Sequence, residues 1–241
     1  MSLERFFSYP SQTVEYVSNV SDRFKYFYLA NPKAASTGIL RTLQLAEVDG
    51  DETLLPEFVH DRDKSPIPTI ARSAFSAEEI LTKGIFFRFT YVRNPFTRAL
   101  SAYLEKIARD EPERQRLLPT LGLDPAADVS FVEFLRAVHA QRDGWRDIHW
   151  TTQCRLIQAN NIPYSYIGRF ESFGATFPRV LDCMGIPAHY FVNDATLAHA
   201  TNAGDRVAEY IGPEERDLIL TIYEGDFTVF GYGADPRTAH L

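Results

Sequence analysis

The sequence predicts an α/β protein built around a parallel sheet. Two β-prone runs, "FKYFYLA" (24–30) and "GIFFRFTYV" (84–92), are each followed by an Asn-Pro pair and then by apolar residues at helical spacing. A strand, a loop and a helix are therefore expected twice, and repeated units of this kind form parallel sheets. Ligands of such sheets bind at the carboxyl ends of the strands, which makes the two loops the first places to look for a site.

The remaining elements are mostly helical. Apolar residues recur at helical spacing in five segments, at 39–43, 96–107, 131–138, 173–184 and 214–223. Ser76 and Glu79 form a capping-box pattern that predicts a short helix, and "YSYIG" (164–168) predicts a short strand. The stretch from 49 to 73 is polar and contains proline, so we expect loops there. No linker or repeat divides the chain, so residues 1–241 are expected to form one domain.

Composition narrows the class of protein. The chain is 45% hydrophobic and 24% charged with a formal net charge of −7, which argues against broad binding to nucleic acid or anionic membranes. Cys154 and Cys183 lack the spacing of metal ligands. They are expected to be buried and reduced, and the alternative is that they form a disulfide with each other. No secretory signal or membrane-spanning stretch is present in the sequence, so a cytoplasmic location is expected. The oligomeric state cannot be read from these features.

The first loop, "NPKAASTG" (31–38), has the features of an anion site. It offers a lysine charge, small side chains and backbone N–H groups at the start of a helix. The candidate binding residues are Lys33, Ala34, Ala35, Ser36, Thr37 and Gly38. The phosphate-loop signature G-x-x-x-x-G-K-[ST] is absent. The alternative is that Ser36 or Thr37 only caps the helix and that Lys33 is solvated.

The second loop, within "FTYVRNPFTRALSAY", offers a second anion site. Arg93 follows an apolar strand and Ser101 lies two helical turns further on, so one guanidinium and one hydroxyl are available for a phosphate. Each has an alternative role: Arg93 in an ion pair, and Ser101 as a hydroxyl in a helix interior. Arg98 either assists the phosphate or pairs with a nearby acid.

These two loops together resemble the donor-binding motifs of sulfotransferases. "NPKAAST" resembles the 5′-phosphosulfate loop P-K-x-[AG]-[SC]-T, and "YVRNPFTRALSAY" resembles the 3′-phosphate motif [FV]-[VL]-R-[DN]-P-x-x-R-x-x-S-x-Y. "DIHWTTQCRLI", "YSYIGRFESF" and "LILTIYEGDFTVFGY" resemble segments of the Golgi carbohydrate sulfotransferases of the chondroitin and dermatan type (family 2). Cysteines of those relatives correspond to Ile157 and Asn160 here, which favours a soluble bacterial member.

The resemblance implies a P-loop-like three-layer α/β/α fold with a central parallel sheet. It also implies in-line transfer of a sulfuryl group from 3′-phosphoadenosine 5′-phosphosulfate (PAPS) to a hydroxyl of a carbohydrate or glycolipid, without a metal. Lys33 and the amides of residues 34–37 would hold the 5′-phosphosulfate, and Arg93 and Ser101 would hold the 3′-phosphate. Catalysis would then rest on positioning and electrostatic stabilisation.

A general base must accept the proton of the acceptor hydroxyl, and histidine titrates in a suitable range. His149 is preferred because it lies in a family-like segment beside Asp147 and next to Trp150, an aromatic ring able to support a sugar. His60, between the two anion motifs, is the alternative, and Glu105 is a weaker third candidate.

Residues expected to contact the acceptor are His60, Arg62, Trp145 and Trp150. Phe227, Phe230 and Tyr232, near the end of the chain, are expected in the core. Two other functions stay open from the sequence. One is a nucleotide-dependent kinase of the phosphate-loop type, which the missing G-K-[ST] and magnesium motifs disfavour. The other is a non-catalytic nucleotide-binding protein of the same fold.

Overall fold

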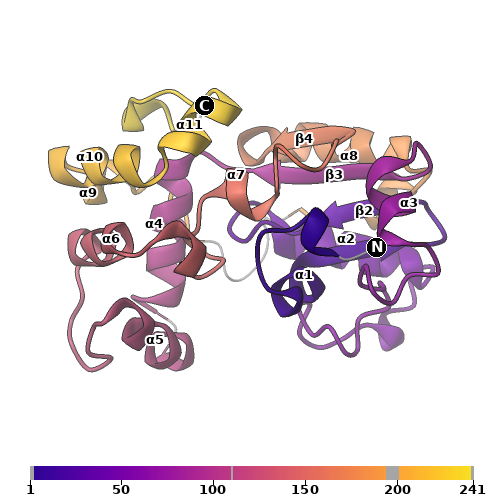
Figure 1. The fold of residues 1–241 in the computed structure, drawn as a ribbon, viewed down its shortest axis with the longest axis horizontal. Coiled ribbons are helices and arrows are strands. Elements are labelled where there is room, and N and C mark those ends of the chain that lie inside the picture. The colour runs from indigo at the N-terminus through magenta and orange to yellow at the C-terminus, as the bar shows by residue number, and fades with distance from the viewer. Residues whose placement is uncertain (1–2, 110, 194–200, 240–241) are drawn as a thin grey trace. The chain divides into compact units, whose positions relative to one another are not determined.

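The computed structural model describes residues 3–109, 111–193 and 201–239. They form two compact units (Figure 1). The sheet unit holds the described residues of Met1–Val92 and Ile157–Leu197, and the helical unit holds those of Arg93–Leu156 and Ala198–Leu241. Neither unit is a continuous stretch of chain. The expectation of a single domain stays a prediction.

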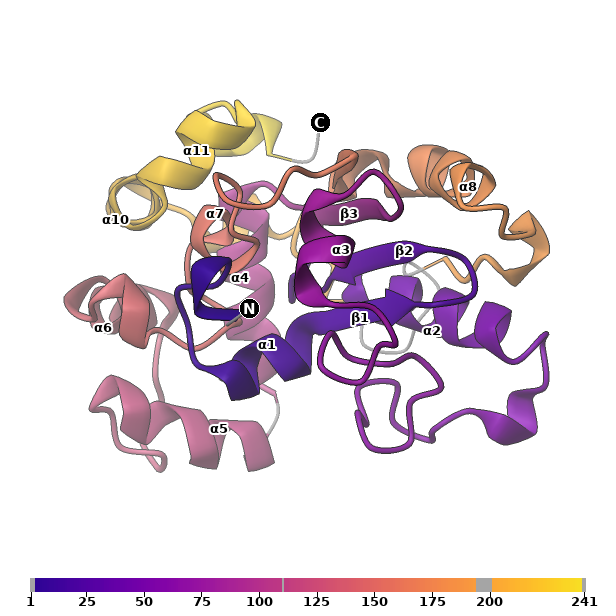
Figure 2. The same ribbon diagram turned by 45° about the vertical axis from the view of Figure 1, so that its right-hand side comes forward.

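The sheet unit contains both helices and short strands. They are, in chain order, η1 (Leu3–Arg5), α1 (Ser11–Val17), β1 (Ser18–Ser21), β2 (Tyr26–Leu29), α2 (Ser36–Glu47), η2 (Glu52–Leu54), α3 (Ala77–Thr82), β3 (Phe87–Val92), β4 (Tyr166–Arg169), η5 (Phe170–Ser172), α8 (Phe173–Cys183) and η6 (Ala188–Tyr190). Figure 2 shows α1, α2, α3 and α8 arranged around the strands.

The elements described in the helical unit are all helices. They are α4 (Pro95–Lys106), α5 (Glu111–Leu117), η3 (Leu118–Leu121), α6 (Phe131–Ala140), η4 (Asp143–Trp145), α7 (Gln153–Leu156), α9 (Val207–Tyr210), α10 (Pro213–Ile222), α11 (Glu224–Phe230) and η8 (Pro236–Thr238). The five helical segments and the capping box at Ser76 and Glu79 expected from the sequence are confirmed.

The sheet has the order β1-β2-β3-β4, with β2, β3 and β4 parallel and β1 antiparallel at one edge. The fold-class prediction is therefore confirmed: the protein is α/β, with a mostly parallel sheet flanked by helices, as in a three-layer α/β/α fold. The edge strand β1 was not foreseen. Its sequence "SNVS" contains one apolar residue, and its extended form depends on pairing with β2 and on the bond from Val20 N to Pro68 O.

Both faces of the sheet are covered. All four side chains of β2 are fully buried, as expected for a strand of a parallel sheet with layers on both sides. On one face, Tyr91 of β3 packs against Phe173 and Phe177 of α8, with ring centroids 5.2 and 5.8 Å away. The parallel pairing of β2 and β3 places their carboxyl ends at the same edge of the sheet.

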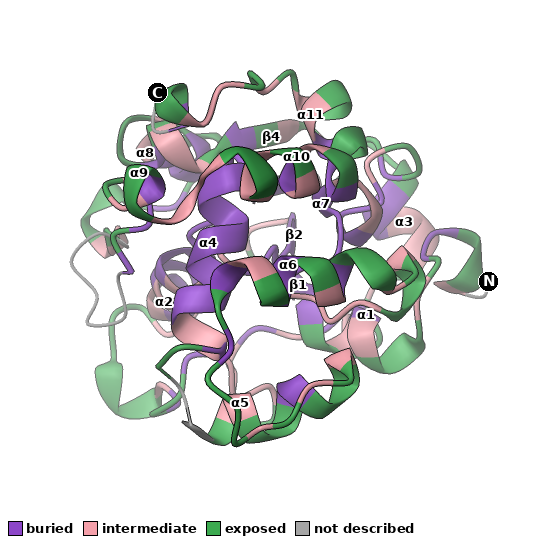
Figure 3. Ribbon diagram, turned by 90° about the vertical axis from the view of Figure 1, so that its left-hand side faces the viewer, coloured by how far each residue is buried: buried purple, intermediate pink, exposed green. Residues whose placement is uncertain are grey.

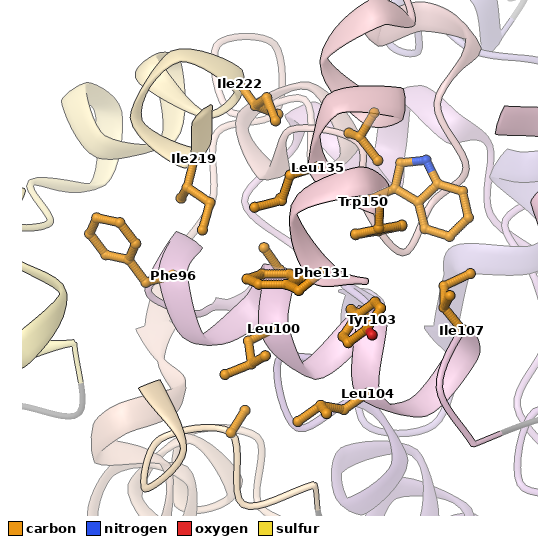
Figure 4. Packing of buried hydrophobic residues seen from close by; sticks show 14 of the residues in the cluster. Phe96, Leu100, Tyr103, Leu104, Ile107, Phe131, Leu135, Trp150, Ile219 and Ile222 are labelled. Carbon is orange, nitrogen blue, oxygen red and sulfur yellow. The ribbon is translucent and has the colours of Figure 1, made fainter. Parts of the chain in front are cut away.

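Helix α4 is the centre of the helical unit. Figure 3 shows it as a largely buried helix, and its first ten residues are all buried. Its apolar side chains pack with those of α6 and α10 in one hydrophobic cluster (Figure 4). Trp150 is fully buried in this cluster, and its ring meets that of Phe134 edge-on at 5.4 Å. The expectation that Trp150 supports a sugar ring is therefore wrong.

Two further expectations about burial need correction. Phe227, Phe230 and Tyr232 are only partly buried, and the fully buried side chain of that segment is Asp226. Both cysteines are free thiols as expected, but Cys183 is exposed and Cys154 is partly buried. The aromatic residues at the end of the chain indicated burial, but they did not show which side chains of this segment the rest of the helical unit would cover.

Candidate active site

The loop between β2 and α2 has an unusual backbone. Lys33 (φ 70°) and Ala35 (φ 62°) lie in the left-handed region, which residues other than glycine rarely adopt, and Ala34 lies between them. Alternation of left-handed and right-handed residues turns successive N–H groups toward one concave side, where an anion binds. The N–H of Ala34 is used within the loop, because it donates to the Asn31 carbonyl at 3.2 Å.

This loop ends in the first turn of a long helix. The N-cap of α2 is Ala35, which has no side-chain cap, so Ser36 and Thr37 are the first helical residues and the alternative that one of them is the cap is wrong. The Ala35 carbonyl accepts the helical bond from Ile39. The amides of residues 36–38 precede that bond and lie at the positive end of the helix dipole.

His60 lies beside this helix start. Its Nε2 is 3.3 Å from Thr37 Oγ1, although the two residues are 23 positions apart. The backbone on both sides of His60 is held in place: Gln44 Nε2 donates to the Val59 carbonyl at 2.9 Å, and Arg62 donates to Asn19 Oδ1 and the Ser18 carbonyl at 2.6 and 2.9 Å. The guanidinium of Arg62 thus anchors the segment that follows His60, and its role as an acceptor contact stays a prediction.

Arg93 is the next residue after β3, and several hydrogen bonds within the helical unit hold it. It is buried, its Nε donates to Thr97 Oγ1 at 3.0 Å, and its backbone N–H and C=O both bond the side-chain amide of Gln153. Within the sheet unit, Asn31 Nδ2 donates to the Tyr91 carbonyl at 2.9 Å, so the ends of β2 and β3 are tied together.

Ser101 lies one turn beyond Thr97 on α4. It is buried, and its Oγ is 3.0 Å from Thr201 Oγ1. Glu105, one turn further along, pairs with Lys106 at 3.1 Å. Thr97, Ser101 and Glu105 therefore follow Arg93 at spacings of four residues, which places these three polar residues along one side of α4.

His149 has the partner expected of an oriented base. Its Nδ1 is 2.6 Å from Asp147 Oδ1, which leaves Nε2 to accept a proton. Burial raises the pKa of the Asp147 carboxyl, but the hydrogen bonds and charge of His149, with help from Arg116, outweigh it, so the pKa lies below its usual value. Asp147 is therefore the ionised partner of the imidazole ring.

The turn that carries His149 is held by Arg98. This fully buried arginine donates to the Ile148 carbonyl at 3.1 Å and to the Thr151 carbonyl at 2.8 Å. Asp143 holds the next residues by accepting bonds from the N–H and hydroxyl of Thr152 at 3.0 and 2.6 Å. From the sequence, Arg98 was expected to assist the phosphate or to pair with an acid. Its bonds to the backbone of this turn were not foreseen.

Three residues near these sites were not singled out from the sequence: Thr97, Gln153 and Asp226. The position of Thr97, four residues after Arg93 and four before Ser101, was a usable signal. Gln153 and Asp226 carried none, because each acts across 60 or more residues of chain. Trp145 remains an accessible aromatic residue, with 82% of its surface exposed.

No group of three or more His, Cys, Asp or Glu residues is positioned to hold a metal ion in the described part of the chain. Among the described helices, none combines the length and the apolar character that a membrane crossing requires.

A mostly parallel sheet, whose strands β2 and β3 lead into a loop of small residues and a buried arginine, defines an α/β protein with helices flanking the sheet. The chain belongs to the sulfotransferase family, whose model matches residues 17–233. It is 30% identical over 240 residues to carbohydrate sulfotransferase 10 of Gallus gallus, covering 88% of this chain and 65% of that protein. Identity to carbohydrate sulfotransferase 10 of Homo sapiens is 28% over 238 residues, covering 88% of this chain and 66% of that one.

Carbohydrate sulfotransferase 14 of Mus musculus is 29% identical over 227 residues, which cover 88% of this chain and 59% of that protein. The chain thus spans slightly less than two thirds of the length of these relatives. No solved structure matches it significantly.

Proposed function

We propose that this protein transfers a sulfuryl group from PAPS to a hydroxyl group of a carbohydrate acceptor. The observation that carries the proposal is the loop at Lys33 and Ala35, whose two left-handed residues form an anion-binding backbone at the N-terminus of α2. Membership of the sulfotransferase family and the names of the relatives support it.

The 5′-phosphosulfate is assigned to the first loop. The amides of residues 35–37 donate hydrogen bonds to its oxygens, whereas the Ala34 amide, also expected to do so from the sequence, donates to the Asn31 carbonyl. The Ser36 and Thr37 hydroxyls add two more donors, and Gly38 keeps the helix start free of a side chain. Lys33 supplies the positive charge that stabilises the oxygen bridging sulfur and phosphorus as its bond to sulfur breaks.

The 3′-phosphate is assigned to Arg93 and Ser101. A guanidinium held through its Nε by Thr97 presents a planar fork that suits a phosphate, and burial strengthens a charge-assisted hydrogen bond. Ser101 supplies a hydroxyl on the same side of α4. The 3′-phosphate is what distinguishes this donor from ordinary nucleotides.

His149 is proposed as the general base. It takes the acceptor's hydroxyl proton on Nε2 while Asp147 accepts the bond from Nδ1–H and stabilises the charged ring. The acceptor oxygen forms its bond to sulfur as the bond from sulfur to the bridging oxygen breaks, and adenosine 3′,5′-bisphosphate leaves. His60, which contacts Thr37, is assigned to the donor side and is the alternative base.

The acceptor class rests on the relatives' names and on one accessible aromatic residue. Trp145 exposes an aromatic face four residues before His149, which suits the apolar face of a sugar ring. We assign a carbohydrate or other hydroxyl-bearing acceptor on this basis.

The test is transfer of radiolabelled sulfate from PAPS to a panel of mono- and oligosaccharides, with the products identified by their mass. Calorimetry with adenosine 3′,5′-bisphosphate and with magnesium ATP is run in parallel. Transfer together with tight bisphosphate binding supports the proposal. Preference for magnesium ATP would favour a kinase, and bisphosphate binding without transfer to any acceptor would favour a non-catalytic binding protein.

A further inference from the structure

Helix α11 contributes a buried carboxylate to the helical unit. Asp226 is fully buried, and its two oxygens accept the backbone N–H groups of Gln153 and Cys154, each at 2.8 Å. An ionised carboxylate is costly to bury unless such donors compensate it. Asp226 therefore holds the first residues of α7 from a position 73 residues further along the chain.

The side chain of Gln153 connects this carboxylate to Arg93. Its Oε1 accepts the Arg93 N–H at 2.9 Å, its Nε2 donates to the Arg93 carbonyl at 2.8 Å, and Nε2 also lies 3.4 Å from Asp226 Oδ2. A reversed amide would place Oε1 against both the carbonyl and the carboxylate, with acceptor facing acceptor. Asp226 thus favours the single amide orientation in which Gln153 bonds both backbone groups of Arg93.

Arg93 occupies a position that needs such support. It lies after the last ladder residue of β3 and before the N-cap of α4, Asn94, where neither element supplies a full set of backbone partners. Gln153 satisfies both of its backbone groups, and Thr97 holds Nε of the side chain. The direction of the guanidinium is determined by these contacts together.

We propose that Asp226 is a positioning residue that acts through Gln153 on Arg93, and that it thereby sets the preference of the protein for a donor with a 3′-phosphate. This inference rests on the proposed function, in which Arg93 binds that phosphate. Asp226 itself touches no part of the donor.

The test measures preference for the 3′-phosphate directly. Dissociation constants for adenosine 3′,5′-bisphosphate and adenosine 5′-monophosphate are measured with the whole chain of residues 1–241. The monophosphate constant divided by the bisphosphate constant gives the preference for the 3′-phosphate alone. Asp226→Asn and Gln153→Ala are each expected to reduce this ratio about tenfold, a change of about 1.4 kcal/mol, while binding of the monophosphate stays within about twofold of wild type. Arg93→Ala gives the ratio without the guanidinium.

A matched control is Asp143→Asn. This carboxylate also holds the backbone that leads into α7, through Thr152, but it does not contact Gln153 or Arg93 in any bond described for it. The ratio of dissociation constants measured for Asp143→Asn should equal that of the wild-type protein. Asp226→Asn in the Arg93→Ala background should also leave the ratio unchanged, because the residue through which it acts has been removed.

Several results would overturn the inference. An unchanged ratio in a folded Asp226→Asn protein would do so, as would equal losses for both ligands, which indicate a structural role only. If Asp226→Asn does not fold by circular dichroism, Gln153→Ala decides the matter by the same ratio. A wild-type protein that binds both ligands equally would overturn the proposed function itself, and the inference with it.

Discussion

The Oγ1 of Thr37 and the Nε2 of His60 lie 3.3 Å apart, which places one of the two candidate histidines at the proposed phosphosulfate loop. The other, His149, has a different environment: its Nδ1 is directed at Asp147. The two rings therefore suit different tasks. A ring that contacts the first turn of α2 suits the donor side, and a ring oriented by a carboxylate suits proton transfer.

Replacing each histidine should separate these tasks. His149→Ala should lower kcat by about 100-fold or more, as expected for loss of a general base, with little change in the dissociation constant for adenosine 3′,5′-bisphosphate. His60→Ala should weaken donor binding. Exposed His139 of α6 serves as the control. If His60→Ala abolishes turnover with donor binding intact while His149→Ala stays active, the base is His60.

Lys33→Ala should lower kcat by about 100-fold or more, because a charge facing the leaving oxygen is worth about as much as an oxyanion-hole donor, and it should also weaken donor binding. Alanine already occupies the left-handed position at Ala35, so the substitution does not demand a new backbone conformation. Steady-state transfer kinetics and calorimetry measure both effects. Lys64→Ala, at an exposed lysine of the same unit, is the control, and unchanged transfer by Lys33→Ala would contradict the assignment of the loop.

Asp143 should make stability depend on pH. Burial raises the pKa of its carboxyl, but bonds from Thr152 and the charge of Arg146 outweigh this, so the pKa lies below 3.8. The folded protein therefore binds this proton less tightly than the unfolded chain, so the stabilisation is present above pH 3.8 and is lost as the pH falls through the folded value.

Asp143→Asn should accordingly lower the free energy of unfolding by about 1–2 kcal/mol at neutral pH, and by progressively less as the solution is acidified below the usual aspartate range. Urea unfolding at neutral and acidic pH measures the difference. Asp182→Asn, at an exposed aspartate of α8, should show no such trend. A difference for Asp143→Asn that is the same at both pH values would show that the ionised carboxylate is not the source of the stabilisation.

The two thiols should differ in reactivity. Cys183 is exposed, whereas burial and then the charge of Asp226 raise the pKa of Cys154 to about 12. Because the thiolate is the reactive form, Cys154 should be modified by a maleimide about 100-fold or more slowly than Cys183. Mass spectrometry of Cys183→Ser and Cys154→Ser proteins assigns each rate to one site. Equal rates would mean that Cys154 is not shielded as described.

Much of the site's local structure was predictable because its causes are local. Small residues after Lys33, an Asn-Pro break after a β-prone run and apolar residues four apart all act within one or two turns of chain. These signals located the loop at Lys33, the helix after Arg93 and the capping box at Ser76. The roles proposed for the site residues stay predictions; they concern Lys33, Arg93, Ser101, His149 and His60.

The remaining features depend on partners far away in the chain. From the sequence, Trp150 was expected to be an accessible aromatic residue beside a histidine. The cluster formed with α4, α6 and α10 buries it completely. Phe227 and Phe230 were expected in the core, yet both are only partly buried, and the fully buried residue is Asp226, next to Phe227 in the sequence. A helix periodicity shows that a segment has two faces, but the neighbouring elements determine which face is covered.

From its sequence alone, this protein is recognisable as an α/β chain with a lysine-bearing anion loop, an arginine after the next strand and a histidine beside an aspartate. Only the tertiary structure decided that Thr37 meets His60, that Arg98 and Asp143 hold the turn of His149, and that Asp226 reaches Arg93 through Gln153. The physical reason is that backbone conformation follows from neighbouring residues, whereas buried polar groups are satisfied by whatever donors and acceptors the folded chain brings to them.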